Sequence, residues 1–218
     1  MEDYYLQENV GYAFLTTQEA ISIFADVDYA LKSGKHIQKC PSQGKLFAFI
    51  KKYYDQLKSY YDNLFDIHLS SEGEGELEYF FIDFFKDGNG YYQRGNIPVE
   101  NREYLAESHL IIAFLLIRMY VLEPRAENRI LVQDFKIQVL SEYEEYKPHL
   151  LRLFAKSEDT KETDYELKSI DDEALKKFND LCWIMIDKNT ETFEIMPSLN
   201  RLLNMFENYI INTPISHE

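Results

Sequence analysis

The sequence has few cysteines, and their spacing excludes two classes of small stabilised fold. Cys40 and Cys182 are the only cysteines among 218 residues, and neither has a second cysteine close by. A disulfide framework or a cysteine-ligated zinc ribbon needs more cysteines at shorter spacings. We therefore expect both side chains to be buried as small apolar groups, in a protein of a reducing compartment.

Long hydrophobic runs are also missing. The longest, residues 110–122, is interrupted by Arg118 and is shorter than the roughly 20 residues that cross a bilayer. The amino terminus, Met1-Glu2-Asp3, is acidic and lacks the apolar region of a signal peptide. These absences predict a cytoplasmic protein with no membrane partner.

Basic residues are scarce overall and concentrated in one segment. The chain has 23 Lys and Arg against 38 Asp and Glu, a net charge of −15, which argues against a protein that simply coats DNA. Residues 31–58, however, contain seven lysines and Asp55 alone, a net charge of +6 that leaves −21 for the rest. One end of the protein can therefore face an anion while the remainder faces a basic protein.

What the sequence has in quantity is hydrophobic periodicity: 45% of residues are hydrophobic and 15% aromatic, so we expect a folded chain. Thr16 and Glu19 form a capping-box spacing before a helix that ends at Ser33-Gly34. A short extended piece and one unbroken helix from about Ser42 to Leu64 are expected next.

On the solvated face of that second helix, ion pairs are predicted four residues apart, Lys51–Asp55 and Lys58–Asp62. Alternation around Ile67 and an apolar run at 78–85 then predict a β-hairpin about an acidic turn.

A third helix is predicted over about 100–122. Its second half is apolar almost all round and must be enclosed by protein, as the centre of a domain or a dimer seam. Glu123-Pro124 ends it and marks the predicted domain boundary. The second half then repeats the order of elements, with helices over about 128–144, from Pro148 and from Ser169 and a polar loop at 156–168. The last of these helices should bury Cys182, before a hairpin over 183–196 and a terminal helix opened by Pro197.

Helices followed by a hairpin, twice over, predict a mainly α fold with small β-hairpins (α+β), arranged as tandem winged-helix domains. The predicted divisions are a tail over 1–16, a first winged-helix domain over 17–123 and a second over 124–218.

No arrangement of residues for catalysis, metal binding or cofactor binding emerges. The five histidines do not share a helical face at metal-ligand spacing. Gly73 and Gly75 lie among glutamates that would repel phosphate, and Asp171-Asp172-Glu173 suits the first turn of a helix. A binding protein without enzymatic activity and without cofactors is favoured.

The segment Ala30-Leu31-Lys32-Ser33-Gly34-Lys35-His36-Ile37 resembles the MukE/MksE family of bacterial condensin subunits, with lysines at two positions where members carry arginine. The likeness continues through Phe47-Ala48-Phe49, Phe65-Asp66-Ile67 and Tyr79-Phe80-Phe81, and returns at Leu181-Cys182-Trp183. The resemblance follows the order of elements over nearly the whole chain, and its residue matches concentrate in the first third.

The resemblance implies a dimeric subunit that grips a kleisin of the MksF/MukF type. Through the kleisin it would reach an SMC ATPase of the MksB/MukB type and support chromosome organisation and segregation at the nucleoid. DNA contact would be non-specific and weak for this chain alone. The expected DNA-binding lysines are Lys32, Lys35, Lys39, Lys45, Lys176, Lys177 and Lys188.

Other hypotheses stay open from the sequence. A plasmid-restricting SMC system of the Wadjet type would use the same kind of subunit. A winged-helix transcription regulator would need a basic recognition helix, and Asp171, Asp172, Glu173 and Asp180 argue against one. A small hydrolase would need a nucleophile with an adjacent base, and the sequence shows no such pairing.

Overall fold

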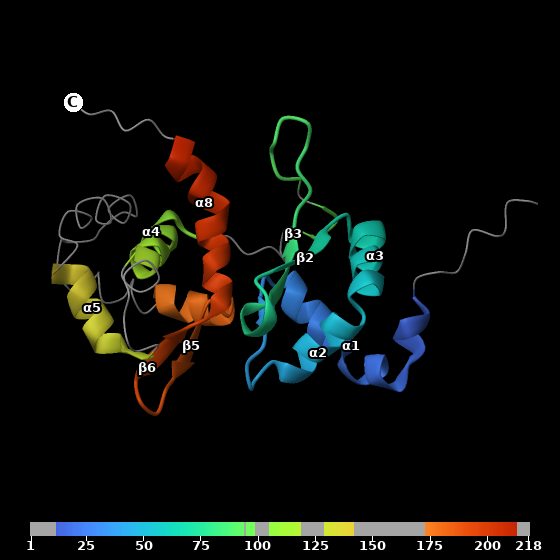
Figure 1. The fold of residues 1–218 in the computed structure, drawn as a ribbon, viewed down its shortest axis with the longest axis horizontal. Helices are drawn as coiled ribbons and strands as arrows, with labels where there is room; N and C mark the ends of the chain where they lie inside the picture. Colours follow the sequence, from blue (N-terminus) through green and yellow to red (C-terminus); the bar gives the residue numbers. More distant parts are fainter. Residues whose placement is uncertain (1–11, 94, 99–104, 119–128, 142–172, 213–218) are drawn as a thin grey trace, which may run out of the picture. The chain divides into compact units, whose positions relative to one another are not determined.

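The computed structural model describes residues 12–93, 95–98, 105–118, 129–141 and 173–212 (Figure 1). The chain divides into two compact units, Met1–Glu103 and Tyr104–Glu218. Each unit combines helices with a small three-stranded antiparallel sheet, so the predicted mixed α+β fold is confirmed. Within the described ranges, no helix is both long enough and apolar enough to cross a membrane.

The first unit begins inside the predicted tail, since residues 13–16 form a 3₁₀ helix whose Phe14 is buried in the core. Its elements in chain order are η1 (Ala13–Thr16), α1 (Gln18–Lys32), β1 (Ile37–Gln38), α2 (Gly44–Lys52), α3 (Tyr54–Phe65), β2 (His68–Glu72), η2 (Gly75–Leu77) and β3 (Tyr79–Asp83).

Helix α1 is capped one residue later than the sequence predicts. The Thr17 hydroxyl oxygen accepts the N–H of Ala20 at 3.1 Å, whereas the Thr16 hydroxyl donates to the carbonyl of Ala13. The helix ends as expected, with Ser33 as C-cap and Gly34 in the left-handed region at φ 83°.

The single helix predicted over 42–64 is wrong, because Tyr53 separates α2 from α3. Its backbone, at φ −111° and ψ 24°, is both the C-cap of α2 and the N-cap of α3. The apolar stripe continues across the break, with Ile50 and Leu57 both fully buried. The buried side chains therefore keep their helical spacing across Tyr53 although the helix is interrupted there. No glycine or proline marks the interruption.

Neither of the two predicted ion pairs forms, and the break accounts for one of them. Lys51 and Asp55 lie on different helices, so they no longer share a helical face, and Lys51 pairs with Glu78. On α3 itself, Asp62 pairs with His68, whose Nδ1 lies 3.0 Å from the carboxylate.

The sheet of the first unit has the order β1-β3-β2, with β3 in the centre. At its β1 edge, a buried amide side chain takes the place of a strand. Gln43 Oε1 accepts the N–H of Gln38 at 3.0 Å, and its Nε2 donates to the carbonyl of His36 at 3.1 Å. Aromatic rings, including Phe14, Phe49 and Phe80, fill the space between sheet and helices.

The second unit contains α4 (Glu107–Ile117), β4 (Arg129–Leu131), α5 (Val132–Ser141), helical residues 173–180, β5 (Ile184–Asp187), β6 (Thr192–Ile195), η5 (Pro197–Leu199) and α8 (Asn200–Asn212). Its sheet has the order β4-β6-β5. The hairpin over 183–196 and the terminal helix after Pro197 are confirmed. The helix predicted from Pro148 and the loop at 156–168 lie outside the described residues.

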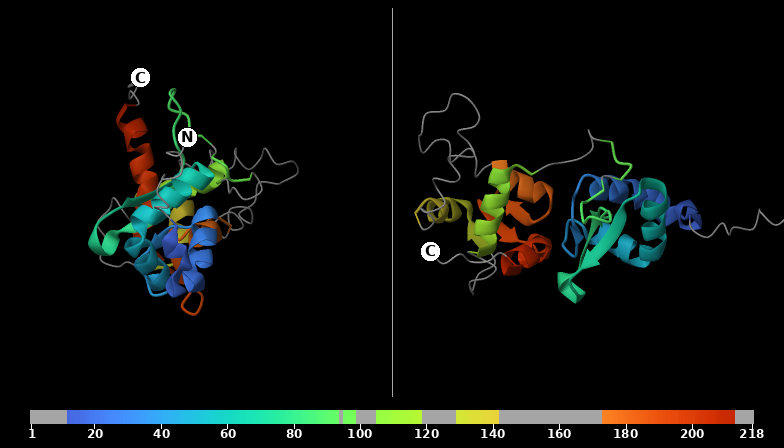
Figure 2. Two further views of the ribbon diagram at one scale, coloured as in Figure 1. Left: turned by 90° about the vertical axis from the view of Figure 1, so that its right-hand side faces the viewer. Right: turned by 90° about the horizontal axis from the view of Figure 1, so that it is seen from above.

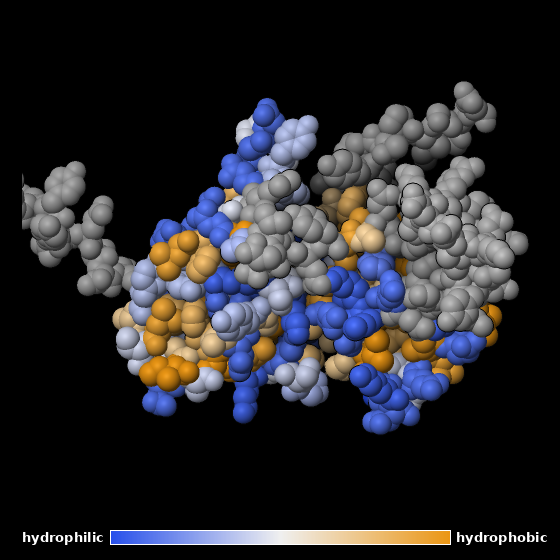
Figure 3. All heavy atoms as spheres, turned by 180° about the vertical axis from the view of Figure 1, so that it is seen from behind, coloured by the Kyte–Doolittle hydropathy of each residue, from blue (hydrophilic) through white to orange (hydrophobic). Residues whose placement is uncertain are grey.

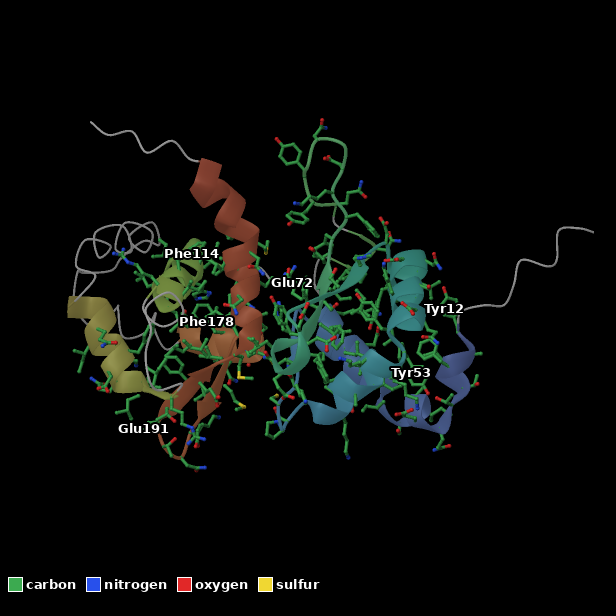
Figure 4. The ribbon with its side chains drawn as sticks, viewed as in Figure 1. Tyr12, Tyr53, Glu72, Phe114, Phe178 and Glu191 are labelled. Carbon is green, nitrogen blue, oxygen red and sulfur yellow. The ribbon has the colours of Figure 1, made fainter. Side chains whose placement is uncertain are left out.

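Helix α4 belongs to the second unit, whereas the predicted boundary after Glu123 placed it in the first. Its buried residues 112, 113 and 115–117 share one core with Phe178, Trp183 and Phe193. Phe114 on α4 packs edge-to-face against Phe206 on α8, and the two helices lie side by side (Figures 1 and 4). The expectation that protein encloses this all-apolar helix is therefore met within the chain.

Two smaller expectations for this unit and the cysteines are wrong. The helix predicted from 128 is preceded by the short strand β4, which pairs with β6. Cys40 and Cys182 are half-buried and form no disulfide, and neither is a core residue. Cys182 has φ 62° and follows the end of the helical segment, and its carbonyl accepts the Ser198 hydroxyl at 2.7 Å.

Candidate nucleic-acid interface

Four of the lysines predicted to contact DNA lie along the connection from α1 to α2. Lys32 is the last residue of α1, Lys35 precedes β1, Lys39 follows it, and Lys45 lies in the first turn of α2. The last three are exposed, while Lys32 is partly buried. The fold therefore presents three of the four to solvent within one short stretch of chain.

Lys32 is engaged inside the first unit. Its amine lies 2.8 Å from Asp28 Oδ2, and its side chain and that of Asp28 are only 20% and 15% exposed. The same amine lies 3.4 Å from the ring centroid of Phe65, a cation–π contact. An ammonium group held in this way serves the packing of α1 against α3 and is poorly placed to meet a phosphate.

The pKa values of two tyrosines next to Lys32, Tyr60 and Tyr61, are raised. Loss of solvent raises the pKa of Tyr61 well above its usual value, and the nearby Asp28 carboxylate adds to the shift. The pKa of Tyr60 is also raised, first by burial and then by Asp28. Both phenols therefore stay protonated near neutral pH, and the cluster contributes no additional negative charge.

Several other lysines of the basic segment meet acidic side chains from elsewhere in the unit. Lys39 pairs with Glu76, and Lys51 pairs with Glu78, both on the turn between β2 and β3. Lys52 lies 2.5 Å from Glu19, a bond that raises the pKa of Lys52 and lowers that of Glu19. Much of the +6 charge seen in the sequence is thus balanced locally.

Lys35, Lys45 and Lys58 remain with no ion pair in the described part of the chain. The glutamates that pair with Lys39 and Lys51 belong to an acidic turn, and from the sequence alone this turn indicates only repulsion of phosphate. Its pairing with a basic segment some 30 residues earlier in the chain follows from the strand register, because β1 and β2 both pair with β3.

The predicted lysines of the second unit lie on two elements. Lys176 and Lys177 belong to the helical residues 173–180, and Lys188 lies in the exposed β5–β6 turn. Lys176 is exposed between Glu173 and Asp180, three residues before it and four after, so that helix presents a mixed charge. Its opposite face is buried through Ala174, Leu175 and Phe178 (Figure 4).

The β5–β6 turn that carries Lys188 is held by Asp187. The Asp187 carboxylate accepts the N–H of Asn189 at 2.9 Å, and this bond lowers its pKa. Glu191 closes the turn with φ 51° (Figure 4). Lys188 is therefore presented by an ordered turn in which acidic residues lie on either side of it.

A second protruding turn, over residues 86–92, was missed as a surface feature. It stands out from the first unit in Figure 1 and in the left view of Figure 2. Asp87 Oδ1 accepts the N–H groups of Asn89 and Tyr91, and the Lys86 amine lies 4.7 Å from the Tyr92 ring. Tyr91 is 74% exposed. In the sequence, the pair Tyr91-Tyr92 directly after the glycine-rich residues 87–90 is the pattern that could have indicated this surface.

Exposed hydrophobic side chains occur on both units, and on the face drawn in Figure 3 they reach the surface between hydrophilic ones. On α1, Ile21 and Tyr29 are 67% and 76% exposed. Exposed aromatic and aliphatic side chains of this kind are typical of protein-binding surfaces.

Nothing in the described residues resembles a metal centre: no three His, Cys, Asp or Glu side chains gather there closely enough to hold an ion. The His68–Asp62 pair is a contact between β2 and α3, with the imidazole also packed against Phe85.

Residues 22–207 match the family model of the condensin complex protein MksE. The chain belongs to the MksE family. This match covers most of both units and confirms the resemblance first seen at residues 30–37. No curated protein matches the chain. As an MksE-family member, the chain is a subunit of a condensin-like complex.

Proposed function

We propose that this MksE-family chain is a non-enzymatic subunit that binds the kleisin of its complex, a protein of the MksF/MukF type. Through the kleisin it joins an SMC ATPase of the MksB/MukB type and supports DNA loading, chromosome organisation and segregation. The observation that carries the proposal is the family match over residues 22–207, which spans both units. The net charge of −15 supports it, because such a chain suits a protein partner better than DNA.

The order of elements supports a tandem winged-helix arrangement. Each unit contains helix, short strand, helix and β-hairpin, and in each sheet the short strand pairs with the second strand of the hairpin. We interpret each hairpin as a wing and the helix before it, α3 or residues 173–180, as the counterpart of a recognition helix. Their mixed charges favour a role in the complex over that of a transcription regulator.

We assign direct DNA contact to Lys35, Lys39 and Lys45. Lys32 leaves the set because it is packed against Phe65 and paired with Asp28. Contacts of lysines with phosphates carry no sequence information and weaken steeply with salt. We therefore propose non-specific contact by the assembled complex at the nucleoid.

The proposal is tested by co-expressing the chain with its cognate kleisin and capturing the kleisin through an affinity tag. We expect the chain to be retained, and we expect the purified chain to be a homodimer by light scattering. A monomer that the kleisin does not capture would contradict the proposal.

The DNA contact is tested in the assembled complex with the triple variant Lys35→Glu, Lys39→Glu, Lys45→Glu. Its DNA affinity should fall while kleisin capture stays intact. The control is the exposed Lys86→Glu, on the protruding turn, combined with the exposed Arg129→Glu on β4, two charge reversals outside the predicted DNA-binding set. Equal losses of affinity per reversed charge in the two variants would show that net charge alone governs binding.

A further inference from the structure

The turn between β2 and β3 carries a glutamate at every second position, namely Glu72, Glu74, Glu76 and Glu78. It is a folded turn: Gly73 and Gly75 both lie in the left-handed region, at φ 74° and 62°, and η2 occupies Gly75–Leu77. The position of its carboxylates is therefore set by the backbone of the hairpin.

Two of these carboxylates reach lysines of the basic segment. Glu76 pairs with Lys39, just after β1, and Glu78 pairs with Lys51, in the last turn of α2. Both contacts follow from the fold, because β3 pairs with β1 and packs against α2. Glu78 is the more enclosed carboxylate, with a side chain 17% exposed, while Glu76 is 78% exposed.

A carboxylate and a phosphate compete for the same ammonium group, and a tethered carboxylate competes at high effective concentration. Exposed ion pairs are individually weak, so the loss of DNA affinity that they cause should be modest but measurable. The residues that would be released, Lys39 and Lys51, belong to the same +6 segment as Lys35 and Lys45.

We infer that the acidic β2–β3 turn occupies Lys39 and Lys51 in place of DNA phosphates and so limits the affinity of the first unit for DNA. The turn acts as an internal competitor: in the free chain only part of the basic segment is open to DNA. Full contact requires the turn to move away, for example when a complex partner holds it elsewhere. This inference rests on the proposed DNA contact of the first unit.

The test is the double variant Glu76→Gln, Glu78→Gln, titrated onto labelled double-stranded DNA of random sequence over a series of potassium chloride concentrations. We expect affinity at low salt to rise about three- to tenfold, from the loss of two surface pairs. The slope of log affinity against log salt should steepen by up to about 1.8, because two more lysines reach phosphates.

A matched control removes the same two charges without touching a lysine pair. Asp26→Asn with Glu74→Gln serves, since Asp26 is exposed on α1 and Glu74 lies in the turn itself. Its affinity should change less than about twofold, as expected for exposed charges that make no contact. Equal gains from the two double variants would overturn the inference, since only long-range charge would then be at work.

A second arm combines Lys39→Gln and Lys51→Gln with each background. Their loss should weaken DNA binding where Glu76 and Glu78 are already glutamine, and have little effect in the natural sequence. An equal effect in both backgrounds, or no DNA binding by any variant, would overturn the inference. Kleisin capture measured on the same proteins separates this outcome from a failure of the proposed function, and circular dichroism confirms that each variant is folded.

Discussion

Replacing Gly73 by alanine should destabilise the β2–β3 hairpin far more than the same change two residues later. At Gly73 an added Cβ would lie 2.2 Å from the carbonyl oxygen of Leu77 and 2.8 Å from its carbonyl carbon. These are backbone atoms of the same turn, so they cannot yield as a flexible side chain would. Gly75 also has a positive φ, but no atom lies within 4 Å of its added Cβ.

The two substitutions share every cost except the clash. Both place alanine in the left-handed region, at about 1–2 kcal/mol, and both recover about 0.4–1 kcal/mol from a less flexible unfolded chain. Gly75→Ala should therefore lower the free energy of unfolding by at most about 1.6 kcal/mol. Gly73→Ala adds an overpacking term of about 1–3 kcal/mol.

Hydrogen exchange measured by mass spectrometry on residues 68–83, with urea denaturation followed by far-ultraviolet circular dichroism, separates the variants. Tryptophan fluorescence is a useful control, because Trp183 is the only tryptophan and lies in the core of the second unit. If Gly73→Ala proved no more destabilising than Gly75→Ala, the described shape of the turn would be wrong. Because this shape positions Glu76 and Glu78, Gly73→Ala should also strengthen DNA binding.

Three further predictions concern the helices. Thr17→Ala should lower the free energy of unfolding by about 1 kcal/mol through loss of the α1 cap, and Thr16→Ala by clearly less, in thermal denaturation. On α3, Leu57→Ala should cost about 2–5 kcal/mol and the half-exposed Leu64→Ala under about 1 kcal/mol, in urea denaturation; similar costs would contradict the described burial. His109 on α4 should titrate below 6.5 by NMR, because burial lowers its pKa against the opposing effect of Glu173. Because folding favours the neutral imidazole, the stability of the protein should be unaffected by this group above pH 6.5 and should fall as the pH drops from 6.5 towards the folded pKa. His109→Gln should remove this part of the pH dependence of stability.

The sequence predicted those parts of the fold that depend on local hydrophobic period. The hairpin at 183–196 and the end of α1 at Gly34 are examples, because turn residues and alternation mark them directly. The break at Tyr53 was not predictable in the same way. The residues on either side of it keep a helical stripe, and neither glycine nor proline stands at the break, so the local sequence gives no sign of it.

Assignment of α4 shows a related limit. Its apolar surface indicated that protein must enclose it, but periodicity carries no information on which core receives the helix. For the candidate interface, the lysines were identified correctly as a basic segment, and their partners were not. Ion pairs such as Lys39–Glu76 join residues far apart in sequence, so they follow from strand register and not from spacing.

The side chain of Gln43 has a consequence for how a partner can attach. Because its amide already fills hydrogen-bonding positions on Gln38 and His36, an incoming peptide finds this border of the sheet occupied and cannot extend it as an added strand there. In the second sheet, the N–H of Ile186 on β5 is likewise taken by the Asn179 side chain, at 3.0 Å. A protein ligand arriving at either place must be recognised through side chains, and the same two amides protect the free chain from edge-to-edge aggregation.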